Sequence, residues 1–151
     1  MVWGCMTWEG VGDAAKIDGR MDGDLYLQIL KDELQNSIRF YGLNPSDIIF
    51  QQDNDPKHTC KKVKEWLDVQ EFRTMVWPAQ SPDLNPIEHL WGHLKRRLAG
   101  YEQPPKGIQE LWRRIEEEWG KIPAEVCQGL IESMPRRIEA VLKAKGGYTK
   151  Y

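Results

Sequence analysis

The sequence has no long hydrophobic run, few cysteines and no large excess of charge of one sign. No apolar stretch among the 151 residues approaches the roughly 18 residues of a membrane-spanning helix, so we expect no membrane segment. The three cysteines are odd in number and widely spaced, which favours free thiols over a disulfide framework. The first residues, MVWGCMTWEGVGD, have neither a basic nor a long apolar region, so we expect no secretory signal.

The net charge of −2 argues against a general polyanion binder, but the charge is unevenly distributed. Residues 1–50 hold 4 basic against 8 acidic residues, whereas residues 51–151 hold 17 against 15. Short basic clusters occur at 61–62, 95–97 and 136–137. Two interpretations remain open: these clusters are solvated helix faces, or they contact phosphates.

The hydrophobic pattern predicts a mixed α/β fold in which strands and helices alternate before an all-helical end. We expect a hairpin at 1–7 and 14–17, a helix at 24–38, and a strand at 47–52 covered on both faces. A helix opening at Pro56 with Asp55 as its N-cap, a strand at 72–77 and a helix from 86 to about 98 follow. The predicted domains are 1–100 and a helical extension, 101–151, packed on it.

Two acidic residues occupy places where ligands bind in α/β folds. Asp53 follows a predicted strand, Glu88 lies in the first turn of a predicted helix, and 34 residues separate them. Carboxylates brought together there repel unless a cation lies between them, and hard oxygen ligands suit Mg²⁺ or Mn²⁺. A structural interpretation competes: Asn85 and Glu88 fit a capping box, and Asp53 fits a hydrogen bond to the following turn.

The histidines and nearby basic residues give further candidates. His89 and His93 are four residues apart and Cys60 is near His58, but this spacing matches no standard zinc pattern. His58 either contacts a phosphate or belongs to the first turn of its helix. Lys95 lies two turns beyond Glu88 on the same helix face, where it can meet the same phosphate chain. The candidate DNA contacts are His58, Lys57, Lys95 and Arg96.

Two sequence motifs carry a resemblance to a known family. QQDNDPKHT, followed by WPAQSPDLNPIEHLWGHLKRRL, resembles the catalytic domain of mariner-type DNA transposases, in the nematode-type branch with an Asp-Asp-Glu triad. The opening MVWGC and the late SMPRRIEAV are also similar to that family. The spacing between Asp53 and Glu88 is that of the second and third acidic residues of this branch.

The resemblance implies an RNase H-like fold with two Mg²⁺ or Mn²⁺ ions, held by Asp53 as the second aspartate and Glu88 as the glutamate. It implies double-stranded DNA as the partner, with no small-molecule substrate. Members of the family cut the ends of their own element and join the freed 3′-hydroxyl to target DNA at a TA step. They work as oligomers in the nucleus, so we expect a nuclear location and a homo-oligomer or an assembly with intact transposase.

The chain also departs from the family pattern. The first catalytic aspartate of the family lies on the strand before the segment that begins here as MVWGC, and the N-terminal helix-turn-helix units are absent. We therefore expect an N-terminally truncated RNase H-like fold lacking its first strand over residues 1–100. Asp13 and Asp18 fall around the second hairpin strand, and we do not expect them to reach the missing position.

Three hypotheses follow from these departures. The favoured one is a transposase-derived catalytic-domain fragment with two of three metal ligands and no activity alone. The second is an active metal nuclease whose missing ligand comes from elsewhere. The third is a non-catalytic module that binds DNA or dimerises and modulates intact transposase, marked by salt-dependent DNA binding that Asp53→Asn leaves unchanged.

Overall fold

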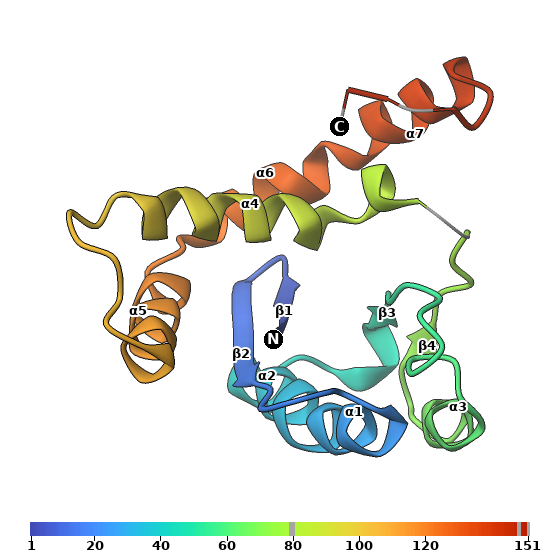
Figure 1. The fold of residues 1–151 in the computed structure, drawn as a ribbon. Coiled ribbons are helices and arrows are strands. Elements are labelled where there is room, and N and C mark those ends of the chain that lie inside the picture. The colour runs from blue at the N-terminus through green and yellow to red at the C-terminus, as the bar shows by residue number, and fades with distance from the viewer. Residues whose placement is uncertain (79–80, 148, 151) are drawn as a thin grey trace. The chain divides into compact units, whose positions relative to one another are not determined.

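The computed structural model describes residues 1–78, 81–147 and 149–150, which form two compact units (Figure 1). The first unit comprises Met1–Cys5 and Gly12–Gln80, and the second comprises Met6–Val11 and Ser81–Tyr151. The elements of the first unit are β1 (Val2–Thr7), β2 (Gly10–Lys16), α1 (Gly23–Ile29), the π-helical η1 (Leu30–Leu34), α2 (Gln35–Phe40), η2 (Pro45–Asp47), β3 (Ile49–Phe50), α3 (Lys61–Asp68) and β4 (Arg73–Thr74). The second unit adds η3 (Pro82–Leu84), α4 (Pro86–Ala99), α5 (Ile108–Gly120), α6 (Ala124–Glu132) and α7 (Met134–Lys143).

The predicted hairpin is confirmed as β1 and β2, whose tip is grouped with the second unit. Met1 and Ile17 exchange two backbone hydrogen bonds at the open end of the hairpin. Close by in β2, the Asp13 N–H donates to the hydroxyl of Ser37 on α2, 2.8 Å away. A Cβ on Gly12 would lie 2.5 Å from both Cys5 Sγ and Ser37 Oγ, so only glycine allows this close approach of the hairpin to α2.

The helix predicted at 24–38 is confirmed, because α1, η1 and α2 run without a break from residue 23 to residue 40. Asp22 caps its start by accepting hydrogen bonds from the N–H groups of Asp24 and Leu25. Its buried face forms half of the hydrophobic core of the first unit, and α3 supplies two more residues to it. The fully or largely buried core consists of Ile17, Met21, Tyr26, Ile29, Leu30, Leu34, Ile38, Val63, Leu67 and Phe72.

The strand predicted at 47–52 is shorter and less covered than expected. β3 comprises Ile49 and Phe50 alone, and Ile49 is 50% exposed, so the prediction of burial on both faces is wrong. β3 pairs in parallel with β4, which is also reduced to two residues of the strand predicted at 72–77. Within the described residues the hairpin and the β3–β4 pair are separate two-stranded sheets, so β3 has a strand partner on one side only.

The helix predicted to open at Pro56 begins later, at Lys61 with Cys60 in the N-cap position. The carbonyl of Asp55 accepts hydrogen bonds from the N–H groups of His58 and Thr59, which closes a single turn that does not continue. The segment between β3 and α3 is therefore a structured loop. This loop carries Asp53.

The second unit is helical, as predicted for the end of the chain. α4 packs on α5 and α6, its residues Leu90 and Leu94 are buried, and Trp91 stacks on Trp119 of α5 with ring centroids 4.8 Å apart. Apart from Met6–Val11, the boundary between the two compact units falls between Gln80 and Ser81. The predicted domain boundary at residue 100 stays a prediction. No helix in the described part of the chain combines the length and apolarity that crossing a bilayer requires.

Candidate functional site

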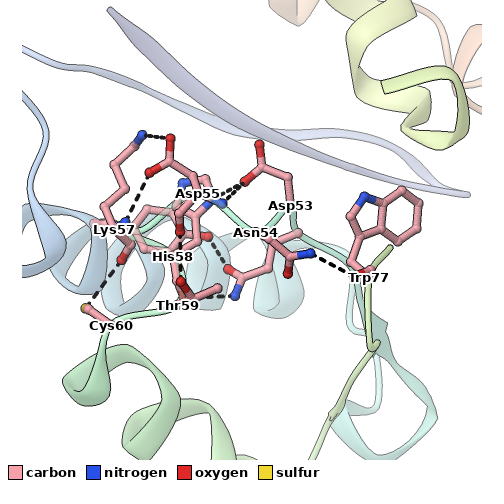
Figure 2. A network of polar contacts seen from close by, with 10 residues as sticks. Asp53, Asn54, Asp55, Lys57, His58, Thr59, Cys60 and Trp77 are labelled. Carbon is pink, nitrogen blue, oxygen red and sulfur yellow. Dashed lines mark hydrogen bonds and ion pairs between the residues drawn. The ribbon is translucent and has the colours of Figure 1, made fainter. Parts of the chain in front are cut away.

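Asp53 is held by its own loop (Figure 2). Its Oδ1 lies 2.6 Å from Nδ1 of His58 and accepts a hydrogen bond of 3.1 Å from the backbone N–H of Asp55. The second bond is the turn contact expected for an aspartate at a strand end, so this part of the structural interpretation is confirmed. The side chain is nevertheless 52% exposed, and its Oδ2 has no hydrogen-bond partner among the described residues. One carboxylate oxygen is therefore engaged and the other is available.

The ring of His58 lies between this carboxylate and the core of the first unit. Its centroid is 4.0 Å from that of Tyr26, whose hydroxyl donates a 2.5 Å hydrogen bond to Oε1 of Gln52. Nε2 of Gln52 donates in turn to the carbonyl of His58. Burial lowers the pKa of His58, against the opposing effect of Asp53, and burial raises the pKa of Tyr26. Tyr26 thus packs against the ring of His58, and Gln52 bonds the backbone carbonyl of the same residue.

Lys57 is engaged within the same loop. Its ammonium forms an ion pair with the carboxylate of Asp55, which also accepts a hydrogen bond from the N–H of Lys57. Burial raises the pKa of Asp55, but the bonds from Lys57 outweigh burial and hold the pKa below its ordinary value. Asn54 fastens the loop to the segment after β4 by donating to the carbonyl of Trp77. Hydrogen bonds and an ion pair among its own residues, with one bond to Trp77, therefore hold the loop in its conformation.

Glu88 lies in the second unit, in the first turn of α4, and its side chain is exposed. The capping-box interpretation is wrong: Asn85 occupies the N-cap position but makes no side-chain capping hydrogen bond, and its N–H donates to the carbonyl of Pro82. The N–H of Glu88 donates to the carbonyl of Asn85, 3.2 Å away. Within the part of the chain that the structure describes, the carboxylate of Glu88 has no hydrogen-bond or ion-pair partner. It is available as a ligand.

The loop before Glu88 is held by residues far along the chain. The carboxylate of Asp83 accepts hydrogen bonds from the hydroxyl of Thr149 at 2.5 Å and from its N–H at 3.1 Å. The carbonyl of Asp83 accepts from Arg137, which is 2% exposed and also donates to the hydroxyl of Ser133. Hydrogen bonds from Thr149 lower the pKa of Asp83. Local sequence spacing could not predict these contacts of Asp83, because they span 54 and 66 residues.

The remaining candidates lie along α4. Lys95 and Arg96 are exposed, whereas their neighbour Arg97 is bound to Glu118 at 2.6 Å and so is less available to a phosphate. His89 and His93 are half-buried, and burial lowers the pKa of each. Among the described residues no group of three or more His, Cys, Asp and Glu side chains is gathered as a metal site.

The structure thus brings Asp53 together with His58, and Lys57 with Asp55, while Glu88, Lys95 and Arg96 belong to the other unit. Sequence reasoning missed Tyr26 and Gln52 as supports of His58. The available signal was a tyrosine inside an apolar helical stripe, because a buried tyrosine hydroxyl needs a hydrogen-bond partner.

Comparison with known proteins identifies the class. Residues 4–111 match the family model described as DDE superfamily endonuclease, and the chain belongs to this family. Its relatives include the Tcb1 transposase of Caenorhabditis briggsae, 44% identical over 151 residues, and the Tc1 transposase of Caenorhabditis elegans, 42% identical over 153 residues. Each alignment covers 100% of this chain and 54% of the relative, so the chain spans about half the length of the curated relatives it matches.

The fold is that of a solved relative. The structure matches the catalytic domain of the Mos1 mariner transposase of Drosophila mauritiana with a TM-score of 0.86, at 24% identity, over 99% of this chain and 75% of that one. That catalytic domain is also solved with Raltegravir and Mn (TM-score 0.85, 23% identity), and Mos1 is solved as a paired end complex with Mn (TM-score 0.86, 23% identity). These matches cover 99% of this chain and 76% and 44% of the others. The expected RNase H-like fold of the DDE family is confirmed.

Proposed function

We propose that these residues form part of the catalytic domain of a Tc1/mariner-type transposase, which cuts and joins double-stranded DNA with divalent metal ions. The observation that carries the proposal is the pair of available carboxylates at the two family positions: Oδ2 of Asp53, which is free of partners among the described residues, and the exposed side chain of Glu88. End-to-end similarity to the Tcb1 transposase supports it.

Asp53 and Glu88 fit a divalent metal by their chemistry, because exposed carboxylate oxygens are the ligands that Mg²⁺ and Mn²⁺ prefer. Structures of Mos1 with Mn and Mg support metal use in this family. A bound ion would activate a water or a 3′-hydroxyl and stabilise the leaving oxygen of a phosphodiester. The chain would present Oδ2 of Asp53 and the exposed carboxylate of Glu88, while His58 and Asp55 keep Oδ1 of Asp53 hydrogen-bonded.

The basic residues of α4 are the proposed DNA contacts of the second unit. Lys95 and Arg96 are exposed, and neither forms an ion pair within the described residues, so both are available to backbone phosphates. Lys57 reaches a phosphate only by exchanging its partner Asp55, so we expect it to contribute less. The Mos1 paired end complex supports DNA as the partner. We further propose that the working form is an oligomer and that the protein acts in the nucleus.

As a separate polypeptide the 151 residues supply two of the three acidic residues of the family triad, and we propose that they do not cleave DNA alone. The test is a nicking assay on labelled duplex DNA with Mn²⁺, comparing wild type with Asp53→Asn. We expect no Mn²⁺-dependent nicking from either, and DNA binding that weakens with salt. Nicking that Asp53→Asn abolishes would show a complete metal site and contradict the proposed inactivity.

A DNA-binding titration at several salt concentrations tests the proposed DNA-binding surface on α4. Lys95→Gln with Arg96→Gln should weaken DNA binding and lower its salt dependence, because each residue that contacts a phosphate releases counterions. Exposed Lys143→Gln and Lys145→Gln on the last helix and its end are the matched control. Equal weakening by both pairs would mean that binding is diffuse and that α4 is not the DNA-binding surface.

A further inference from the structure

We propose that His58 is a positioning residue for Asp53: it holds Oδ1 of the carboxylate so that Oδ2 is the oxygen presented to the metal ion. This inference rests on the proposed function and adds to it, because the position of His58 in the sequence suggested only a phosphate contact or a place in the first turn of a helix.

Both hydrogen bonds that Asp53 accepts fall on the same oxygen. Oδ1 lies 2.6 Å from Nδ1 of His58 and 3.1 Å from the N–H of Asp55, while Oδ2 has no partner among the described residues. An ionised carboxylate only accepts hydrogen bonds, so Nδ1 of His58 carries the proton in this contact. Two donors from different parts of the loop restrain the rotation of the side chain. The oxygen left for a cation is thereby fixed in place although half of the side chain is exposed.

The donor is itself fixed by the core. The ring of His58 lies against that of Tyr26, which is 1% exposed, with centroids 4.0 Å apart and an interplanar angle of 31°. Gln52 joins the two residues by accepting from the hydroxyl of Tyr26 and donating to the carbonyl of His58 at 3.1 Å. Tyr26 belongs to α1, so a rigid helix of the core supports the carboxylate through one imidazole ring. Figure 2 shows the ring of His58 facing the carboxylate of Asp53 within this network.

Two other roles for His58 fit the geometry less well. Its Nδ1 is occupied by Asp53, and its Nε2 is buried with no hydrogen-bond partner among the described residues. A buried nitrogen reaches neither a metal ion nor a DNA phosphate without moving the ring away from Tyr26. Outer hydrogen-bond partners of metal ligands orient those ligands, and their loss weakens metal binding by about 10–100-fold.

The experiment separates the hydrogen bond from the packing of the ring. His58→Phe keeps a ring against Tyr26 and removes the Nδ1 donor, whereas His58→Asn keeps a donor near the position of Nδ1 and removes the ring. Mn²⁺ affinity of the 151-residue chain is measured by electron paramagnetic resonance, and thermal unfolding is measured without metal. We expect His58→Phe to weaken Mn²⁺ binding about 10-fold or more, and His58→Asn to retain most of the affinity despite a lower unfolding temperature.

The reverse pattern, normal affinity in His58→Phe and lost affinity in His58→Asn, would show that His58 only packs and would overturn the inference. Asp53→Asn tells this failure apart from failure of the proposed function. If Asp53→Asn binds Mn²⁺ as the wild type does, Asp53 is no ligand and the proposed function fails. If Asp53→Asn weakens binding and folded His58→Phe does not, the inference alone fails. Should His58→Phe not fold, loss of affinity in folded His58→Asn equal to that of Asp53→Asn overturns the inference.

Discussion

The loop that carries Asp53 and the helix start that carries Glu88 take their support from different parts of the chain. Around Asp53 the contacts are short in sequence: His58 and Asp55 bond the carboxylate directly, and Lys57 bonds Asp55. The turn before Glu88 is instead held by α7 and the end of the chain, which bond Asp83 across 54 and 66 residues. A candidate carboxylate can thus be bonded directly by its own loop, with Tyr26 of α1 behind the ring of His58, or follow a turn that a distant helix holds, and the two arrangements should fail differently.

The largest effect is expected from Arg137→Met in the second unit. Arg137 is buried and donates to Ser133 and to the carbonyl of Asp83, so its loss leaves buried acceptors without a charged donor. The free energy of unfolding should fall by about 2–4 kcal/mol in chemical denaturation. The adjacent, exposed Arg136→Met is the control and should stay within about 0.5 kcal/mol of wild type. Equal effects of the two variants would remove the claim that α7 supports the turn before Glu88.

A somewhat smaller effect is expected in the first unit from Gly12→Ala. The new methyl group would overlap Cys5 and Ser37 and push β2 away from α2, at a cost of about 1–3 kcal/mol of unfolding free energy. Gly120→Ala is the control, because nothing lies within 4 Å of a Cβ there and alanine suits a helix. A neutral Gly12→Ala would mean that the packing of β2 on α2 tolerates this displacement and is not what stabilises the first unit.

The two carboxylates themselves should differ modestly in metal-free protein. Asp53→Asn weakens a charge-assisted hydrogen bond to His58 and should lower the free energy of unfolding by about 1 kcal/mol. Glu88→Gln alters no hydrogen bond or ion pair among the described residues and should change stability by less than about 0.5 kcal/mol. Denaturant titrations without divalent ions measure both. A larger loss for Glu88→Gln would reverse the comparison.

The smallest expected effect is a pH dependence that His93 contributes on α4. Burial, with Arg96 and Arg97 next, lowers the pKa of His93 in the folded protein. The unfolded chain then takes up the proton more readily, so the free energy of unfolding should fall as the pH drops through about 6.5, the ordinary pKa of histidine. His93→Gln should give a shallower loss of stability between about pH 7.5 and 5.5. An unchanged slope would show that His93 is not protonated differently in the two states.

Much of the fold follows from sequence periodicity, as the continuous helix from 23 to 40 and α4 show. The predictions that were wrong concern where individual helices and strands begin and end. Asp55 and Pro56 look like a helix start, but side-chain contacts of Asp53 and Lys57 close a loop there instead, and α3 begins at Lys61. The apolar run at 48–50 predicts a strand covered on both faces, yet the extent of a strand depends on its partners, and β3 pairs on one side only within the described residues.

In the candidate site, the carboxylates could be proposed from the sequence, whereas the residues that support them could not. Asp53 and Glu88 are predicted as metal ligands from their positions at a strand end and a helix start and from the motifs around them. Their supports are not, because the contacts of Tyr26 with His58 and of Arg137 with Asp83 join segments far apart in sequence. A tyrosine or arginine at a buried position indicates that a hydrogen-bond partner exists, but only the tertiary structure shows which residue it is.

The most direct test of the account is a double-mutant cycle for Mn²⁺ binding with Asp53→Asn, Glu88→Gln and the double variant. If the two carboxylates share a metal site, each single substitution should weaken binding, and the double variant should bind little worse than the weaker single one, because residues that act together are not additive. Additive losses would place the two residues at separate sites. Unchanged affinity in both single variants would contradict the metal-binding role of Asp53 and Glu88.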